Sequence, residues 1–109
     1  MKTLVITNDY FPKKGGISTY IKSFEDHLKF EKIIFAPNWA EGPNIVNSKS
    51  KFIFGSRTHL REINQIIKQH NIEIILHASS NPQFYLVDKL KNFGLNQYMI
   101  IHGAEFNVI

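Results

Sequence analysis

The stretch TLVITNDYFPKKGGISTY, residues 3–20, decides the fold. It begins with a short run rich in β-branched residues, which is typical of a strand in a parallel sheet covered on both faces. Gly15 and Gly16 indicate a loop, and apolar residues then recur at helical spacing up to Leu28. A strand, a glycine-containing loop and an amphipathic helix in this order predict the first βα unit of an open α/β sheet.

Further strands and helices are expected after this unit. Apolar runs predict strands at residues 32–36, 51–54, 72–77 and 98–101, and a polar loop is expected at 37–50. A second helix is expected to begin after Ser56 or Thr58, which are suitable N-caps. Its apolar inner face would consist of Leu60, Ile63, Ile66 and Ile67. Asn81 and Pro82 are expected to open a third helix, which Gly94 ends.

This order of elements, β-α-β-β-α-β-α-β, predicts an open, mostly parallel Rossmann-like sheet in the order 3-2-1-4-5, with helices on both faces. The residues expected to be buried in its central strands are Val5, Ile34, Ile75 and Ile100. Apolar residues continue after the last strand, where a domain of this class normally has a closing helix. Residues 1–109 are therefore expected to form one domain, incomplete at its C-terminal end, whose uncovered last strand favours self-association.

The composition limits the partners of the chain. With 109 residues, of which 43% are hydrophobic, it has the size and apolar content of a single globular domain. It has no cysteine, which excludes disulfides and thiolate metal sites, and no apolar run approaches the ~18 residues of a membrane span, so cytoplasmic residence is expected. The net charge of +4 comes from scattered basic residues, so nucleic-acid binding is not expected. Peripheral contact with anionic lipid at the inner membrane face stays open.

Three segments are expected to meet at the carboxyl ends of the strands, where open parallel sheets bind ligands. The first is the loop after the first strand. Gly15 and Gly16 allow its backbone to approach a ligand and leave free N–H groups at the start of a helix, which suits a phosphate. A tight strand-to-helix turn without a ligand explains the two glycines equally well.

The other two segments each begin with a histidine at a strand end. His77 ends the strand at 72–77, and His102, followed by Gly103, ends the last strand. An imidazole there can hydrogen-bond a substrate hydroxyl, although a single histidine in this position is more often structural. Asp9 and Glu105 could complete a metal site, but nothing in the spacing requires one. Three further histidines lie on predicted helices in polar surroundings and are expected to be solvated: His27, His59 and His70.

With these motifs the sequence resembles the family 4 glycosyltransferases of the GT-B fold, which include bacterial mannosyltransferases acting on phosphatidylinositol. The resemblance extends over the whole chain. It rests on TNDYFPKKGGISTY at residues 7–20, IEIILHASS at 72–80 and MIIHGAEF at 99–106. In that family two Rossmann-like domains face each other across a cleft. The N-terminal domain holds most of the acceptor, and the C-terminal domain holds most of the nucleotide-sugar.

The resemblance implies that the chain is the acceptor-side domain of a retaining glycosyltransferase. This enzyme would move a hexose from a nucleotide-sugar to a glycan or a lipid-linked acceptor. It implies no cofactor and no metal, because the family's reaction is described as front-face attack with departure of the diphosphate. The family's E-x7-E motif and its phosphate-binding Arg/Lys pair belong to the C-terminal domain, which residues 1–109 do not contain. The chain alone is therefore expected to be inactive.

The resemblance also implies roles for individual residues. His102 is the expected catalytic residue, since it would reach the transferred sugar, and Gly15 and Gly16 would border the donor diphosphate. The residues expected on the acceptor side are Asn8, Asp9, Tyr10, Lys13 and Lys14. The residues expected to support the site are His77, Gly103 and Glu105.

A second class of function stays open, namely a non-catalytic, flavodoxin-like α/β module that binds a phosphorylated ligand or a protein partner. A response regulator of this type would have an acidic residue where His77 ends its strand. A flavin-binding module would have a Ser/Thr-rich loop in place of Lys13 to Gly16. A nicotinamide enzyme would have an acidic residue after the strand at 32–36, where Pro37 stands. These departures favour the glycosyltransferase interpretation.

Overall fold

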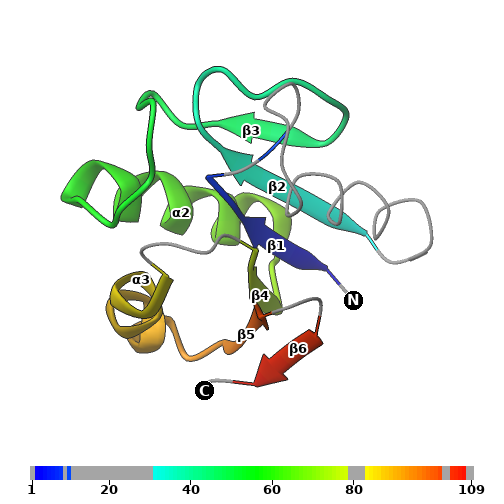
Figure 1. The fold of residues 1–109 in the computed structure, drawn as a ribbon. Helices are drawn as coiled ribbons and strands as arrows, with labels where there is room; N and C mark the ends of the chain where they lie inside the picture. Colours follow the sequence, from blue (N-terminus) through cyan, green and yellow to red (C-terminus); the bar gives the residue numbers. More distant parts are fainter. Residues whose placement is uncertain (1, 9, 11–30, 79–82, 102–103, 108–109) are drawn as a thin grey trace.

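In the computed structural model of the protein, the described residues form a central sheet on which two helices pack (Figure 1). The structure describes residues 2–8, 10, 31–78, 83–101 and 104–107, and it describes only the backbone at 83–84, 100–101 and 104–107. The elements are β1 (Thr3–Ile6), β2 (Lys32–Ala36), β3 (Ile45–Asn47), α2 (Arg57–His70), β4 (Ile74–His77), α3 (Gln83–Leu90), the 3₁₀ turn η1 (Lys91–Phe93), β5 (Asn96–Ile101) and β6 (Ala104–Asn107).

Five parallel strands form the body of the sheet in the order β3-β2-β1-β4-β5, which confirms the predicted topology. β1 lies between β2 and β4, with Val5 opposite Ile34 on one side and Leu76 on the other. Within the sheet, β2 and β3 lie on one side of β1, and β4 and β5 lie on its other side. The switch point of the sheet therefore lies between the carboxyl ends of β1 and β4.

A sixth strand, β6, pairs antiparallel with β5 and covers the edge of the sheet that was expected to be bare. Ile101 of β5 stands opposite Ala104 of β6, so two residues separate the strands. A connection of two residues is long enough to join two antiparallel strands. Phe106, one of the apolar residues after β5, thus lies in a strand that extends the sheet. The prediction of an uncovered fifth strand is wrong, and one reason for expecting self-association falls with it.

The third strand lies earlier in the chain than predicted. β3 falls inside the expected polar loop, whereas residues 51–54 form no strand. Asn44 has a positive φ of 60°, and it turns the chain so that Ile45 aligns with Ile34 of β2. Within 51–54 only Ile53 is buried, and the phenylalanines on either side of it are exposed. Three consecutive apolar residues at 52–54 have the pattern of a short strand, whereas polar residues on both sides of β3 weaken its strand signal.

The caps expected at Ser56 and Gly94 are confirmed, whereas Asn81 and Pro82, which are expected to open α3, lie outside the described residues. The hydroxyl of Ser56 accepts a hydrogen bond from the backbone N–H of His59 at the start of α2, and Asn71 ends this helix in the left-handed conformation. Gly94, with a φ of 73°, ends the turn η1 after α3. The predicted inner face of α2 packs on the core and consists of Leu60, Ile63, Ile66 and Ile67.

Both described helices pack on the same face of the sheet and enclose its main core (Figure 1). Strands, helices and the segment before α2 contribute buried residues to this core, among them Leu4, Ile6, Phe35, Ile53, Ile75, Leu86 and Leu90. The opposite face carries a second cluster around Val5, Ile34 and Leu76. The burial predicted for Val5, Ile34 and Ile75 is confirmed. The side chain of Ile100 and the helix expected up to residue 28 lie outside the described residues.

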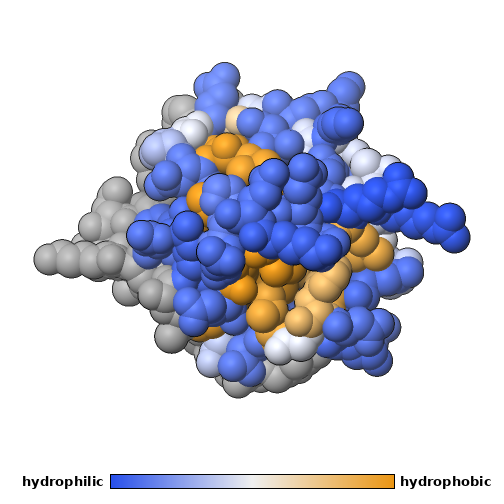
Figure 2. Space-filling model, turned by 180° about the vertical axis from the view of Figure 1, so that it is seen from behind, coloured by the Kyte–Doolittle hydropathy of each residue, from blue (hydrophilic) through white to orange (hydrophobic). Residues whose placement is uncertain are grey.

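On the face of the molecule opposite to that in Figure 1, most of the described surface is hydrophilic. Figure 2 shows this face, where hydrophobic residues reach the surface in separate patches between hydrophilic ones. Neither of the two described helices is long and apolar enough to cross a membrane.

Candidate functional site

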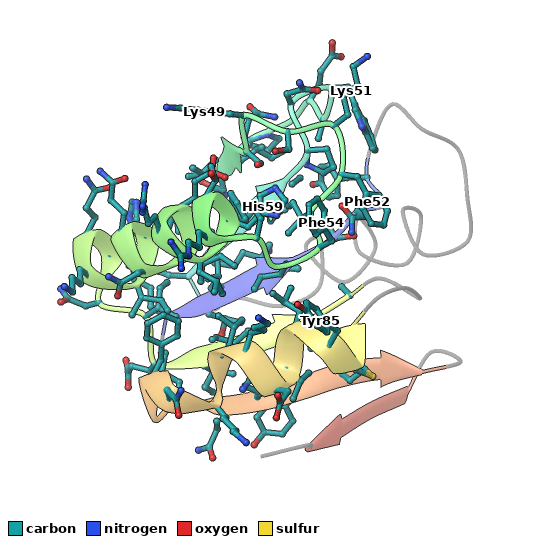
Figure 3. All side chains as sticks on the ribbon, turned by 90° about the vertical axis from the view of Figure 1, so that its left-hand side faces the viewer. Lys49, Lys51, Phe52, Phe54, His59 and Tyr85 are labelled. Carbon is teal, nitrogen blue, oxygen red and sulfur yellow. The ribbon has the colours of Figure 1, made fainter. Side chains whose placement is uncertain are left out.

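The carboxyl ends of the parallel strands meet at one edge of the sheet, where open α/β sheets bind ligands. After β3 the chain crosses this edge as residues 48–56, which we call the edge loop, and then enters α2. The edge loop is bound to residues that follow β1 and β2. It carries the two lysines and two phenylalanines labelled in Figure 3, so its attachment decides which groups the edge offers to a ligand.

At the switch point, the hydrogen bonds of the sheet continue past the ends of β1 and β4. The N–H of Ala78 donates to the carbonyl of Ile6 at 2.9 Å. The hydroxyl of Thr7 donates to the carbonyl of Ala78 at 3.2 Å, and both residues are buried. The described part of the switch point is therefore filled by contacts of the protein with itself. The neighbouring residues 9 and 79–82 lie outside the described residues.

Asn8 joins the end of β1 to the edge loop. Its Nδ2 donates to the carbonyl of Ile53 at 2.7 Å, and its Oδ1 accepts from the N–H of the same residue at 2.6 Å. The side-chain amide thus binds Ile53 as the backbone of a neighbouring strand would. Asn8 is buried, and these two bonds commit its amide to the loop.

The segment after β2 holds the first half of the edge loop. The N–H of Asn38 donates to the carbonyl of Ser50 at 2.9 Å, and the indole Nε1 of Trp39 donates to the carbonyl of Lys51 at 3.0 Å. Asn47, at the end of β3, fixes this segment through two further bonds from its Nδ2, to the carbonyls at 37 and 40. The loop therefore has a defined course along the edge.

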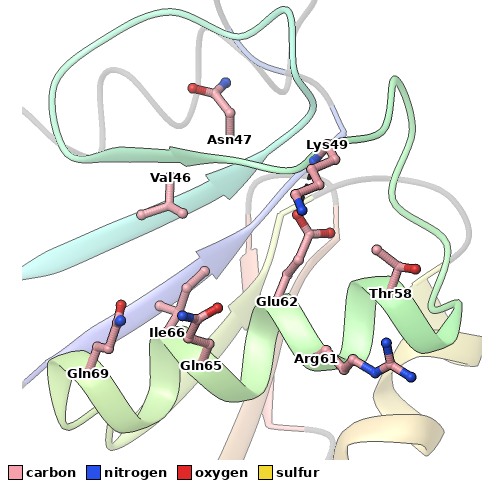
Figure 4. A pocket seen from close by; sticks show the side chains of 9 residues that line it. All are labelled: Val46, Asn47, Lys49, Thr58, Arg61, Glu62, Gln65, Ile66 and Gln69. Carbon is pink, nitrogen blue, oxygen red and sulfur yellow. Dashed lines mark hydrogen bonds between the residues drawn. The ribbon is translucent and has the colours of Figure 1, made fainter.

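Glu62 of α2 binds the start of the edge loop through its carboxylate. Its two carboxylate oxygens accept from the hydroxyl of Ser48 at 2.9 Å and from the N–H of Lys49 at 3.0 Å. Glu62 also lines a groove of about 510 Å³ between β3 and α2, together with Arg61 and several amide side chains (Figure 4). The one carboxylate among the lining residues is thus engaged in the fold. The groove combines apolar surface, to which Val46 and Ile66 contribute, with amide groups that can form hydrogen bonds.

His59 holds the second half of the edge loop, and the prediction that it is solvated is wrong, because only 1% of it is exposed. Its Nδ1 accepts three backbone N–H groups, from Phe54 and Gly55 at 3.2 Å and from Ser56 at 3.3 Å. Since Nδ1 accepts, Nε2 carries the proton and donates to the hydroxyl of Ser50 at 2.9 Å. The ring also meets that of Phe54 edge to face, with centroids 4.8 Å apart.

A sequence signal for this role exists in the spacing of Ser56 and His59. A helix N-cap and the residue three positions later can satisfy each other's backbone N–H groups in a capping box, and His59 occupies the position where glutamate or glutamine is usual. The small Gly55 before the cap, with a φ of 98°, allows the preceding backbone to turn onto the imidazole ring. Because His59 has polar neighbours along the helix, the hydropathy of the sequence alone does not predict its burial.

The buried position of His59 changes its protonation. Burial lowers the pKa of His59 below its ordinary value of 6.5, and the carboxylate of Glu62 opposes this shift. The folded chain therefore keeps the imidazole neutral at a pH where the unfolded chain protonates it. The contribution to stability is fully present above pH 6.5 and is lost as the pH falls from 6.5 through the lower pKa of the folded state.

We expect the free energy of unfolding to fall below pH 6.5, with His59 contributing up to about 1.4 kcal/mol per pH unit. Urea denaturation at a series of pH values measures this slope. His59→Gln, which keeps an acceptor at the capping position but does not titrate, should flatten the slope, and His70→Gln on the last turn of α2 should not. Equal slopes for the parent chain and His59→Gln would contradict the assignment.

His77, which is expected to support the site, lies at the end of β4 and contacts β5. Its Nε2 lies 2.6 Å from Oε1 of Gln97, and Nε2 of Gln97 donates to the carbonyl of Val87 at 3.1 Å. Both polar side chains have no exposed surface. The imidazole thus links three elements through one buried chain of hydrogen bonds. These contacts favour the structural interpretation of His77 over direct contact with a substrate.

The remaining predicted site residues are distributed as follows. Tyr10 is buried, and its ring lies 3.3 Å from where a Cβ on Gly42 would stand. Glu105 lies in β6 opposite Ile100, within an antiparallel strand rather than at a parallel strand end. The predicted residues outside the described part are Asp9, Lys13, Lys14, Gly15, Gly16, His102 and Gly103. Among the residues that the structure describes, no three histidine, aspartate or glutamate side chains gather as metal ligands would.

Comparisons with known proteins connect this fold to an enzyme class. No protein-family model matches the chain. It aligns at 24% identity over 116 residues with a protein of Mycolicibacterium smegmatis, the GDP-mannose-dependent alpha-(1-6)-phosphatidylinositol monomannoside mannosyltransferase. Proteins of the same name in two strains of Mycobacterium tuberculosis align at 24% identity over 120 residues. The chain is a distant homologue of these mannosyltransferases, as its resemblance to GT-B enzymes predicts.

The alignments differ in how much of each protein they cover. They include 94–95% of this chain but only 30–31% of the relatives. The chain therefore corresponds to one α/β unit within much longer enzymes.

Proposed function

We propose that this chain, a distant homologue of mannosyltransferases, is the acceptor-side domain of a retaining glycosyltransferase. The enzyme would move a hexose from a nucleotide-sugar to a lipid-linked or glycan acceptor. The alignment over 94–95% of the chain carries this proposal, because the relatives are named for GDP-mannose and for a phosphatidylinositol mannoside. These are accordingly the first donor and acceptor to test.

The proposal assigns residues 1–109 to an N-terminal domain that acts together with a second one. In GT-B enzymes the second Rossmann-like domain holds most of the nucleotide-sugar, and the chain spans only 30–31% of its relatives. We therefore expect transfer activity from a protein that joins both domains, and none from residues 1–109 alone.

Within this enzyme the chain would contribute positioning and electrostatic stabilisation. The N–H groups near Gly15 and Gly16 would approach the donor diphosphate, and the imidazole of His102 would hydrogen-bond the transferred sugar. The topology is consistent with this division, because β5, which precedes His102, lies beside β4, and β4 lies beside β1. No metal ion is needed, since the N–H groups and the second domain would stabilise the leaving diphosphate.

The acceptor side would be formed by the segment after β1 and by the edge loop. Asp9, Lys13 and Lys14 would contact the acceptor directly. Asn8 and Tyr10 are buried, and we therefore assign them a positioning role, in which they fix the course of the loops on either side of the acceptor.

Transfer of mannose by a protein that joins residues 1–109 to a second Rossmann-like domain tests this function. His102→Ala should raise the activation free energy by about 1.5–3 kcal/mol and so lower kcat roughly 10-fold to 150-fold, because it removes a hydrogen bond to the reacting sugar. KM should change less than kcat, since the bond serves the transition state more than the bound ground state. The measurement is steady-state transfer from GDP-mannose, with circular dichroism to verify folding.

His70→Ala is the matched control, because His70 lies on the last turn of α2, away from the carboxyl edge. It should leave kcat unchanged. A folded His102→Ala enzyme with full activity would remove this histidine from the site. If the unsubstituted two-domain protein transferred no sugar from any nucleotide-sugar, the proposed function itself would be refuted.

A further inference from the structure

β3 forms one edge of the described sheet, where only β2 lies beside it. The carbonyl of Asn44 accepts a hydrogen bond from β2 at 2.8 Å, and the N–H of Ser48 donates one to β2 at 2.7 Å. Backbone polar groups of successive strand residues point to opposite sides, so those of Ile45 and Asn47 face away from β2. Within the described part of the chain, these N–H and carbonyl groups have no hydrogen-bond partner.

Glu62 marks the end of this free edge. The N–H of Lys49, two residues after Asn47 and pointing to the same side, donates to a carboxylate oxygen of Glu62 at 3.0 Å. The carboxylate thus takes the place that the carbonyl of a neighbouring strand would have. Two donors and two acceptors stay free, on Ile45 and Asn47. Residues two apart in a strand are separated by about 6.6 Å, the repeat of any extended peptide, so one added strand can meet all four groups.

The groove between β3 and α2 lies beside the free edge (Figure 4). Val46 packs on the same core as α2, and with Ile66 it gives the groove apolar surface. Gln65 and Gln69 add amide groups from the helix. A strand laid along β3 would direct every second side chain toward the helix. The edge and the groove therefore offer backbone pairing and side-chain contacts together, as peptide recognition by strand addition requires.

The charges of the groove favour an acidic partner. Its lining residues include two cations, Lys49 and Arg61, neither of which forms an ion pair with another described residue. The one carboxylate, that of Glu62, accepts hydrogen bonds from the edge loop with both oxygens. The other charged residues of α2, Arg57 and Lys68, are also basic. Acidic side chains on an added strand would thus meet an excess of positive charge.

We propose that the free edge of β3 and the groove beside it bind an extended acidic segment of a partner protein, which joins the sheet as a further strand. Nucleic acids and lipid headgroups are anionic too, but they do not present alternating N–H and carbonyl groups that match those of Ile45 and Asn47. β2 separates β3 from β1, so this surface lies to the side of the switch point. The proposal does not depend on sugar transfer.

A fluorescently labelled octapeptide of alternating glutamate and valine is the probe, and fluorescence anisotropy measures its binding. The protein should bind it about tenfold more tightly than the same peptide with lysine in place of glutamate. Arg61→Gln should weaken binding about threefold, the effect of one exposed ion pair, and less at high salt. Arg57→Gln is the matched control, because it makes the same change of charge on α2 at a residue that does not line the groove. It should leave binding unchanged.

Amide hydrogen exchange followed by NMR tests the strand pairing itself. The N–H groups of Ile45 and Asn47 should exchange quickly in the protein alone and become protected when the acidic peptide binds. The N–H of Ser48 is the internal control, since β2 accepts its hydrogen bond with or without the peptide. Proline in place of the two central residues of the probe removes a donor from each of its edges and should abolish most of the binding.

Four outcomes would overturn the proposal. The first is no binding of the acidic peptide, and the second is binding that leaves Ile45 and Asn47 unprotected, which would be charge attraction alone. The third is displacement of the peptide by an equal concentration of citrate, which would indicate a site for small anions. The fourth is protection that rises with protein concentration without peptide, which would identify a second copy of the chain as the occupant. A protein that transfers mannose but shows any of these retains its proposed function and loses the peptide site.

Discussion

His59→Ala is expected to lower the free energy of unfolding by about 3 kcal/mol. The substitution removes the acceptor of three backbone N–H groups, of which that of Gly55 is buried, and it leaves a cavity under Phe54. It also deprives Ser50 of its partner on Nε2. The loss should appear as a lower midpoint of urea denaturation, followed by far-ultraviolet circular dichroism.

The control for this substitution is His70→Ala, in the same helix and with a more accessible side chain. It should change the free energy of unfolding by no more than about 0.5 kcal/mol. His59→Gln should recover part of the loss, because glutamine can still accept from the N-cap. Equal stabilities of His59→Ala and His70→Ala would show that the edge loop does not depend on the imidazole.

Asn8→Asp is expected to lower the free energy of unfolding by about 2–3 kcal/mol at neutral pH. The substitution retains the shape of the side chain but replaces the donor Nδ2 with a carboxylate oxygen. This oxygen would face the carbonyl oxygen of Ile53, which lies 2.7 Å from Nδ2 of Asn8 in the parent chain, and the two oxygens would repel each other. The stability should partly return in acid, because a protonated carboxyl group can again donate. Urea denaturation at neutral and acidic pH measures both effects.

Asn38→Asp makes the same chemical change at an exposed site. The Nδ2 of Asn38 donates to the carbonyl of Lys49 at 3.4 Å, a long and solvent-accessible bond, so its loss should cost little. If the two aspartate variants have the same stability, the amide of Asn8 does not hold the loop.

Much of the fold could be predicted because its signals are local. The run at residues 3–7 indicates a central strand, and Ser56 and Gly94 mark helix ends through their own conformations. The order of the five parallel strands then follows from the alternation of strands and helices. β3 and β6 were not predictable in this way, because short strands depend on a neighbour that is already in place. Ile45 becomes a strand residue only through its register with Ile34.

The candidate site could be predicted less well, for a related reason. Asn8 and Ile53 are 45 residues apart in the chain, and nothing in either segment indicates the other. A polar residue next to a strand end therefore suggests contact with a ligand, although it binds the protein itself. The same applies to His77, whose partner Gln97 lies on the next strand. The burial of these amide and imidazole groups depends on tertiary packing that the sequence pattern does not encode.

The single tryptophan of the 109-residue chain has its indole N–H fixed to the carbonyl of Lys51. Indole emission responds to hydrogen bonding and to the polarity around the ring. The fluorescence spectrum of the chain therefore reports, without any added label, whether the edge loop is bound to Trp39. The same spectrum distinguishes a variant that has lost only this attachment from one that has unfolded, since local release shifts the emission while the circular dichroism of the helices persists.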